Sequence, residues 1–121
     1  MQERPNVIVE KTLGFALSII ELAEELESRR KFVVANQILK SGTSIGANVR
    51  EAQNAESKAD FIHKMKIAAK EADETEYWLL LCQQSKLYPD CESQQKEIKE
   101  IIKILSKIIA SSKSKTTTYS N

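Results

Sequence analysis

Hydrophobic residues recur every three or four positions over four long stretches of this chain, which is the spacing of one face of an α-helix. Short polar segments separate the stretches, and Pro89 interrupts the pattern before the last one. We therefore predict helices at about residues 7–28, 32–54, 58–86 and 92–111. Residues 112–121 are mostly Ser, Thr and Lys, and we predict a mobile tail there.

The composition supports a purely helical chain. Three glycines and two prolines are too few for a β-protein, which needs a turn about every ten residues. Amphipathic helices joined by short connections pack as antiparallel neighbours. The sequence thus predicts a single all-α domain over residues 1–121, folded as an up-down-up-down four-helix bundle.

The segment at residues 40–52 resembles a loop in composition but a helix in spacing. It is rich in Ser, Gly, Thr and Asn, yet its apolar residues keep the helical period. Each glycine inside a helix costs about 1 kcal/mol relative to alanine. We therefore expect another helix to pack closely over Gly42 and Gly46, which lie on one side of the predicted helix.

Polar residues near the inward face of this segment have two interpretations. In one of them Ser44 is a nucleophile, but the sequence offers no base for it. In the other, which we favour, Ser44 and Asn48 join Glu74 and Glu76 in a buried hydrogen-bond network that fixes the helix register. Asn48 is then expected to bond to one of the two carboxylates.

The remaining candidates for chemistry are few. His63 follows Asp60 by one helical turn, but a solvent-facing histidine is the more economical interpretation. Cys82 and Cys91 lack the spacing of a zinc site, and one histidine cannot complete a di-metal bundle site. We expect no enzyme activity, no metal, no cofactor and no small-molecule substrate.

Charge and hydropathy restrict the location and the partners of the protein. The net charge of +1 gives no strong attraction to nucleic acid or to an anionic membrane. No segment resembles a signal peptide or approaches the roughly 20 apolar residues that span a bilayer. A cytoplasmic protein without a membrane partner is therefore expected.

A row of lysines follows one face of the last predicted helix and could contact the phosphates of RNA or DNA. Glutamates interleave with them, so in a single chain the row is better interpreted as a solvated face. In an oligomer the row would repeat and become a basic surface. Its members are Lys96, Lys99, Lys103 and Lys107.

Self-association is the clearest expectation about partners. The first predicted helix carries two apolar stripes, which is more than a small bundle can bury. Tyr77 and Trp78 are adjacent, so both cannot face one core. We expect Phe15, Tyr77 and Trp78 to contribute to a subunit interface.

The segment at residues 40–52 and the helix after it also resemble a known family, the four-helix-bundle proteins called 23S rRNA intervening-sequence proteins. The resemblance covers roughly residues 10–110, and Ala52 stands where the family often has glycine. The matching residues are Ser41-Gly-Thr-Ser44-Ile45-Gly-Ala47-Asn48-Val-Arg-Glu51, Asp60-Phe61, Ile67-Ala68, Glu74-Thr-Glu76 and Trp78-Leu79.

The resemblance implies a short antiparallel bundle that assembles into a ring-like homopentamer and carries no established catalytic residues. Such proteins are encoded in bacterial rRNA insertions or elsewhere in genomes. A related branch, the accessory proteins of diversity-generating retroelements, works with a reverse transcriptase and nucleic acid. We therefore expect a non-enzymatic oligomeric protein associated with RNA or ribosomes. The alternative is a nucleic-acid-binding accessory protein, against which the near-neutral charge argues.

Overall fold

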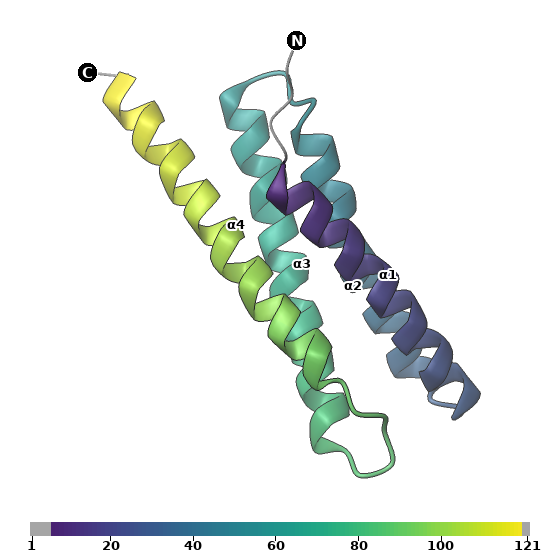
Figure 1. Ribbon diagram of the computed structural model, residues 1–121. Helices are drawn as coiled ribbons and strands as arrows, with labels where there is room; N and C mark the ends of the chain where they lie inside the picture. The colour runs from purple at the N-terminus through teal and green to yellow at the C-terminus, as the bar shows by residue number, and fades with distance from the viewer. Residues whose placement is uncertain (1–5, 120–121) are drawn as a thin grey trace.

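The computed structural model describes residues 6–119, with side chains up to residue 114, and shows an all-α antiparallel bundle (Figure 1). α1 packs on α2, α2 on α3, α3 on α4, and α4 returns to α1, whereas α1 and α3 lie diagonally opposite, as do α2 and α4. The predicted four-helix bundle is confirmed. Its helices are α1 (Val7–Ser28), α2 (Phe32–Ala52), α3 (Lys58–Gln84) and α4 (Glu92–Tyr119).

Side chains cap the starts of α1 and α3. The Asn6 side chain accepts a hydrogen bond from the Val9 amide at 3.4 Å, and Ser57 accepts one from the Asp60 amide at 3.0 Å. The Asp60 carboxylate in turn accepts from the Glu56 amide at 3.2 Å. These bonds satisfy amide groups that have no partner within a helix, and they fix where α1 and α3 begin.

The connection between α1 and α2 is a tight turn at residues 29–31. Arg30 adopts a left-handed backbone conformation with φ of 63°, and the Lys31 amide donates to the Leu26 carbonyl at 2.8 Å. A left-handed residue followed by a bond back into the last turn is a common way to end a helix, although glycine is the usual residue there. The turn therefore holds α1 and α2 in one fixed relation.

Three predicted helix ends differ from the observed ones. α2 ends at Ala52 and α3 at Gln84, each slightly earlier than expected. The prediction that the last helix ends near residue 111 was wrong, because α4 continues to Tyr119. Neither Pro nor Gly occurs after Ser111, so nothing in the sequence stops the helix at that point. Residues 120–121 lie outside the described part of the chain.

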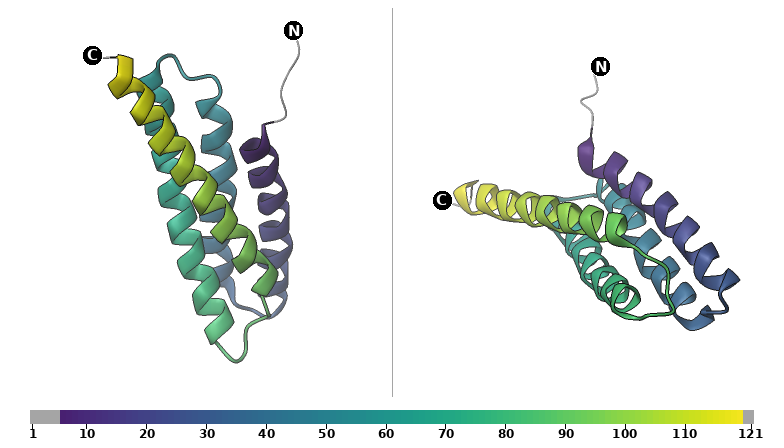
Figure 2. Two further views of the ribbon diagram at one scale, coloured as in Figure 1. Left: turned by 60° about the vertical axis from the view of Figure 1, so that its left-hand side comes forward. Right: turned by 60° about the horizontal axis from the view of Figure 1, so that its bottom comes forward.

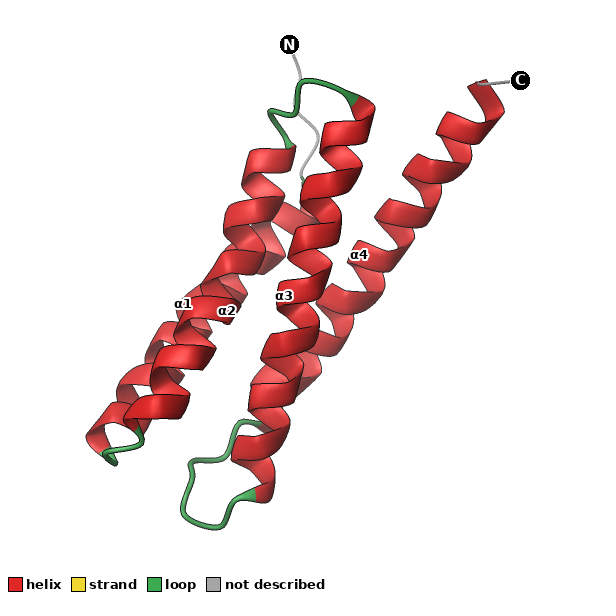
Figure 3. Cartoon of the chain, turned by 180° about the vertical axis from the view of Figure 1, so that it is seen from behind, coloured by secondary structure: helices red, strands yellow, loops and turns green. Residues whose placement is uncertain are grey.

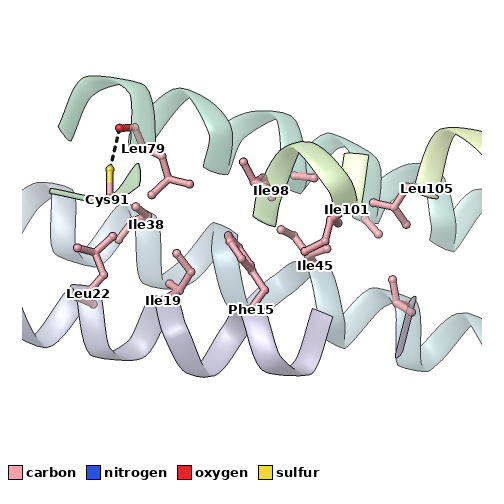
Figure 4. Close-up of a cluster of buried hydrophobic side chains, with 14 of the residues drawn as sticks. Phe15, Ile19, Leu22, Ile38, Ile45, Leu79, Cys91, Ile98, Ile101 and Leu105 are labelled. Atoms are coloured by element: carbon pink, nitrogen blue, oxygen red, sulfur yellow. Dashed lines mark hydrogen bonds between the residues drawn. The ribbon is translucent and has the colours of Figure 1, made fainter. Parts of the chain in front are cut away.

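The core lies along the axis of the bundle, and all four helices contribute to it (Figure 4). Phe15 and Ile19 of α1 lie near Ile45 of α2 in the core, which also holds Ile98 and Ile101 of α4, and each of these side chains is fully buried. A buried side chain of this size stabilises the fold by roughly 1.5–3 kcal/mol. The labelled core residues are Phe15, Ile19, Leu22, Ile38, Ile45, Leu79, Cys91, Ile98, Ile101 and Leu105.

α4 is the least integrated helix of the bundle. It starts beside the end of α3 and then leans away from α1, so that its C-terminal end stands apart from the start of α1 (Figures 2 and 3). The α1–α4 contact is the smallest of the four helix contacts. Polar contacts across it include the pair of Lys11 with Glu100 at 2.7 Å and the hydrogen bond that Gln94 donates to the Ser18 hydroxyl at 3.0 Å.

Candidate interaction surfaces

Residues 40–52 form continuous helix within α2, and α1 lies directly over both glycines of this segment. A Cβ atom added to Gly42 would lie 2.8 Å from Ile19 Cγ2, and one added to Gly46 would lie 3.3 Å from the Thr12 carbonyl oxygen. The close approach that the spacing predicts is therefore present. The absence of a side chain lets the Ile19 side chain pack directly over Gly42 and lets the Thr12 backbone lie against Gly46.

A buried polar contact joins α2 to α3. The Thr75 and Ser41 hydroxyl oxygens lie 2.8 Å apart, and Thr75 Oγ1 also lies 2.7 Å from the Glu71 carbonyl oxygen. Both side chains are almost completely excluded from solvent. Because a buried hydroxyl without a partner is costly, this pair favours one register of α2 against α3. The pair was not predicted, although Ser41 and Thr75 both lie on inward stripes.

The prediction of a hydrogen-bond network between Ser44 and Asn48 of α2 and the carboxylates of α3 was wrong, because these residues have other partners. Asn48 is half-buried and donates to the carbonyl and hydroxyl oxygens of Ser44, at 2.9 and 3.1 Å, within its own helix. Glu74 instead accepts from the Trp78 indole at 3.1 Å, and Glu76 lies 3.4 Å from Lys99 of α4. Both carboxylates point away from α2 because the inward position of this turn is taken by Thr75.

α1 divides its apolar residues between the core and the surface. The stripe that contains Phe15 faces inward, and Phe15 is fully buried by its own chain, so its assignment to a subunit interface was wrong. The exposed apolar residues instead lie on the other stripe and beside it. Leu13, Leu17 and Ile20 are exposed by 51%, 58% and 38%.

Two hollows lie on opposite faces of the bundle. One, of about 130 Å³, lies in the α1–α2 seam between residues that include Leu13, Ala16 and Arg50. The other, of about 240 Å³, lies in the α3–α4 seam and is lined by Asp73, Glu76, Tyr77, Leu80, Gln95 and Lys99. Because the helices pack in the cyclic order α1-α2-α3-α4, these two seams face away from each other.

The adjacent aromatic residues of α3, Tyr77 and Trp78, point in different directions, as expected for neighbouring positions on a helix. Tyr77 is exposed and lines the α3–α4 hollow, whereas Trp78 is half-buried and packs against the core. Their rings meet edge to face, with centroids 5.7 Å apart. Leu80 and Leu81 are also exposed nearby. The end of α3 therefore carries a second apolar surface, distinct from the one on α1.

The lysine row of α4 is exposed along its whole length. Lys99 lies near Glu76, and the pKa of the Glu100 carboxyl is lowered mainly by its hydrogen bond to Lys11 and to a lesser extent by the charge of Lys103. The start of the row, Lys96 and Lys99, thus lies among carboxylates. Lys103 and Lys107 lie in the later part of α4, whose sequence contains no Asp or Glu.

The residues considered for catalysis do not assemble into a reactive set. His63 is exposed, and Asp60 is used in the cap of α3. Burial raises the pKa of the Cys82 thiol to about 11 and that of Cys91 to about 12. Cys91 Sγ lies 3.3 Å from the Leu79 carbonyl oxygen, as a protonated thiol donor would. Both cysteines are therefore unreactive core residues at neutral pH.

Between residues 6 and 119, no group of three or more His, Cys, Asp and Glu side chains is arranged to hold a metal ion. No helix in this part of the chain is long and apolar enough to cross a membrane.

Comparison with known proteins identifies the family. No curated protein matches the chain. One similar solved structure is the crystal structure of a protein with unknown function from the S23 ribosomal protein family of Bacteroides thetaiotaomicron. It is 48% identical, has a TM-score of 0.80, and aligns over 84% of this chain and 97% of that one. The model of the 23S rRNA-intervening sequence protein family matches residues 4–111. The chain therefore belongs to the 23S rRNA-intervening sequence protein family.

Proposed function

We propose that this protein is a non-enzymatic, ring-forming assembly protein of the bacterial cytoplasm that associates with RNA or ribosomes. One observation carries the assembly: exposed apolar side chains and a hollow occur on each of two opposite faces of the bundle. A soluble monomer seldom leaves such surfaces in water. The number of subunits, five, comes from the resemblance to the family.

The two faces differ from each other, which favours head-to-tail contact. A twofold dimer would pair identical faces and leave the other face of each subunit exposed. Contact between the α1–α2 face of one subunit and the α3–α4 face of the next would cover both. Repetition of that contact gives a closed ring or an open filament. In a closed ring both faces of every subunit are covered.

The charges on the two faces complement each other. Arg50 borders the α1–α2 hollow and forms no salt bridge with any described residue. Asp73 and Glu76 border the α3–α4 hollow. Opposite charges beside apolar contacts set register and suppress wrong pairings more than they add affinity. The arrangement supports a fixed relation between neighbouring subunits.

Light scattering at micromolar concentration tests the assembly. We expect a wild-type mass of several chains, and a mass near one chain for Leu17→Glu and for Leu80→Glu, because each places a charge in an apolar contact. Val33→Glu is the matched control, since Val33 is 74% exposed but lines neither hollow. A monomeric wild type would refute the assembly, and a stable dimer would refute the ring.

A charge exchange tests which faces meet. Arg50→Glu should weaken the assembly, and adding Asp73→Arg should restore it by recreating the pair with opposite signs. If the double variant assembles no better than Arg50→Glu alone, the two faces do not meet at these residues. This outcome would leave self-association itself intact if the wild-type mass is that of an oligomer.

A second candidate function is a nucleic-acid-binding accessory protein acting beside a reverse transcriptase or another nucleic-acid enzyme. The exposed lysines of α4 favour it. A ring would repeat these lysines around its circumference and produce a basic surface that a single chain lacks. Titration of a structured RNA at low salt tests this second candidate, because absence of binding removes it.

A further inference from the structure

One apolar surface of the bundle belongs to neither of the two faces that carry the seam hollows. Val33 at the start of α2 and Leu87 between α3 and α4 are each 74% exposed, the highest value among the large hydrophobic residues of the described chain. Phe32 is 53% exposed. The start of α2 and the α3–α4 connection lie at the same end of the antiparallel bundle (Figures 1 and 3). We call this end, residues 30–33 and 85–88, the turn end.

A lysine joins the two parts of the turn end. The Lys31 amino group lies 5.2 Å from the centroid of the Tyr88 ring, within the range of a cation–π contact, and Tyr88 packs against the core. Beside this contact lies a hollow of about 530 Å³, which is larger than either of the seam hollows. It is lined by Lys31, Ser85, Lys86, Leu87 and Tyr88. The turn end thus places two cations and exposed aliphatic carbon around one hollow.

The lining of this hollow is positive although the chain as a whole is nearly neutral. It contains two lysines and no acid, and neither lysine forms a salt bridge with a described residue. Acids at the neighbouring helix ends, such as Glu27 and Asp90, lie outside the lining. The lysines attract an anionic group, and the exposed aliphatic side chains favour an apolar one. A ligand that carries both kinds of group matches the hollow.

We propose that the turn end binds the surface of a lipid bilayer that contains anionic phospholipids. Lys31 and Lys86 contact headgroup phosphates, and Val33 and Leu87 lie among the first carbons of the acyl chains. This inference goes beyond the proposed function and does not require the ring, because the ring contact uses the other two faces. The expected absence of a membrane partner rested on the net charge and on the lack of a spanning segment, and neither governs contact at one end of the molecule.

The residue types of the turn end favour a bilayer over other anionic partners. Single-stranded nucleic acid is held by cations together with aromatic rings on which bases stack. Val33 and Leu87 are aliphatic, and Tyr88 already contacts Lys31 and the core. The centres of protein interfaces are depleted of lysine. At a membrane surface, by contrast, the apolar stem of a lysine lies beside acyl carbon while its ammonium group reaches the phosphates.

Sedimentation of the full chain with lipid vesicles tests the charged part of the contact. We expect the wild type to bind vesicles of equal parts phosphatidylcholine and phosphatidylserine, and to bind pure phosphatidylcholine more weakly. Lys31→Gln/Lys86→Gln should weaken binding to the mixed vesicles about thirtyfold, because two cations near an anionic surface are lost. Lys31→Arg/Lys86→Arg is the matched control, because it keeps both charges and should retain wild-type binding.

The apolar part of the contact is tested separately. Leu87→Gln should weaken binding to the mixed vesicles about tenfold, because it removes an exposed aliphatic side chain without adding charge. Val7→Gln is its matched control, since Val7 is 59% exposed but lies at the start of α1, at the opposite end of the bundle. Both replaced side chains are exposed, and circular dichroism of each variant checks that the helices are retained.

The outcomes separate the turn end from other surfaces and other partners. Failure of the wild type to bind the mixed vesicles refutes the proposal, and so does equal binding to the two kinds of vesicle, because the lysines then contribute nothing. If Val7→Gln weakens binding as much as Leu87→Gln, the contact lies elsewhere and the turn end is refuted. If the wild type binds an RNA hairpin but no vesicles, and Lys31→Gln/Lys86→Gln loses the hairpin, the turn end is a nucleic-acid contact and the proposal is refuted.

Discussion

The α1–α2 seam and the α3–α4 seam show two ways in which helices of similar sequence character can pack. α1 lies on α2 at Gly42 and Gly46, where the Ile19 side chain and the Thr12 backbone take the space that a Cβ atom would occupy. α4 leans across α3 with long polar side chains along the outer edge of the seam, such as Glu76 and Lys99 at 3.4 Å. The first seam is defined by shape, and the second leaves room for charged side chains.

Overpacking the glycine seam should have the largest effect. Gly42→Leu would drive its side chain into Ile19, and we expect a loss of about 1–3 kcal/mol in the free energy of unfolding. Thermal melting measures the change. Gly14 is the control, because a Cβ added there meets nothing within 4 Å. Gly14→Ala should raise stability by up to about 1 kcal/mol. Equal melting temperatures for wild type and Gly42→Leu would contradict the close packing.

The buried contact between α2 and α3 should come next. Thr75→Val removes the Thr75 hydroxyl and leaves the Ser41 hydroxyl buried without this partner. We expect the free energy of unfolding to fall by about 1–2 kcal/mol. Ser41→Ala/Thr75→Val removes both hydroxyls and should cost less than the sum of the single substitutions. Urea unfolding of the four proteins gives the coupling energy. Strictly additive costs would show that the two hydroxyls do not depend on each other.

The smallest effect is expected where α4 meets α1. Lys11 is half-buried and Glu100 is exposed, and ion pairs at such surface positions contribute little. Lys11 lowers the pKa of Glu100, so the stabilisation is present above the ordinary pKa of a glutamate and is lost as the pH falls through the lowered value. Glu100→Gln should remove this pH dependence and barely alter melting at high salt. A large destabilisation would mean that α4 depends on this contact.

Helical spacing predicted where the helices begin and where two helices approach closely. It was less informative about how each helix is rotated, that is, about which of its faces points into the core. The starts of the helices follow from the periodicity of the apolar residues. The contact at Gly42 and Gly46 also follows from it, because a position without a side chain on the apolar face marks a close approach of another helix. Two apolar stripes on one helix do not reveal which of them faces inward, and Phe15 was placed wrongly for that reason. The partner of Asn48 was missed because a local bond to Ser44 satisfies the amide without another helix.

Charge separation was visible in the sequence but is hidden by a net charge of +1. The absence of acids after Glu100 can be read directly from the chain. Residues 61–70 of α3 also contain no acid, and their position at the same end of the bundle follows from the antiparallel order. The continuation of α4 beyond residue 111 could not be read in this way. The sequence carried no stop signal there, and the polar composition was misinterpreted as a tail.

The turn at residues 29–31 sets a limit on how the chain can change in length. The Arg30 backbone is in the left-handed region, and the Lys31 amide donates a hydrogen bond to the Leu26 carbonyl. The turn therefore cannot accommodate an inserted residue without losing this geometry. An insertion there would rotate α2 by about 100° and turn Gly42 away from Ile19. The connection at residues 85–91 is longer and can accept extra residues without moving the glycine seam. Length variation should therefore accumulate between α3 and α4 and be excluded between α1 and α2.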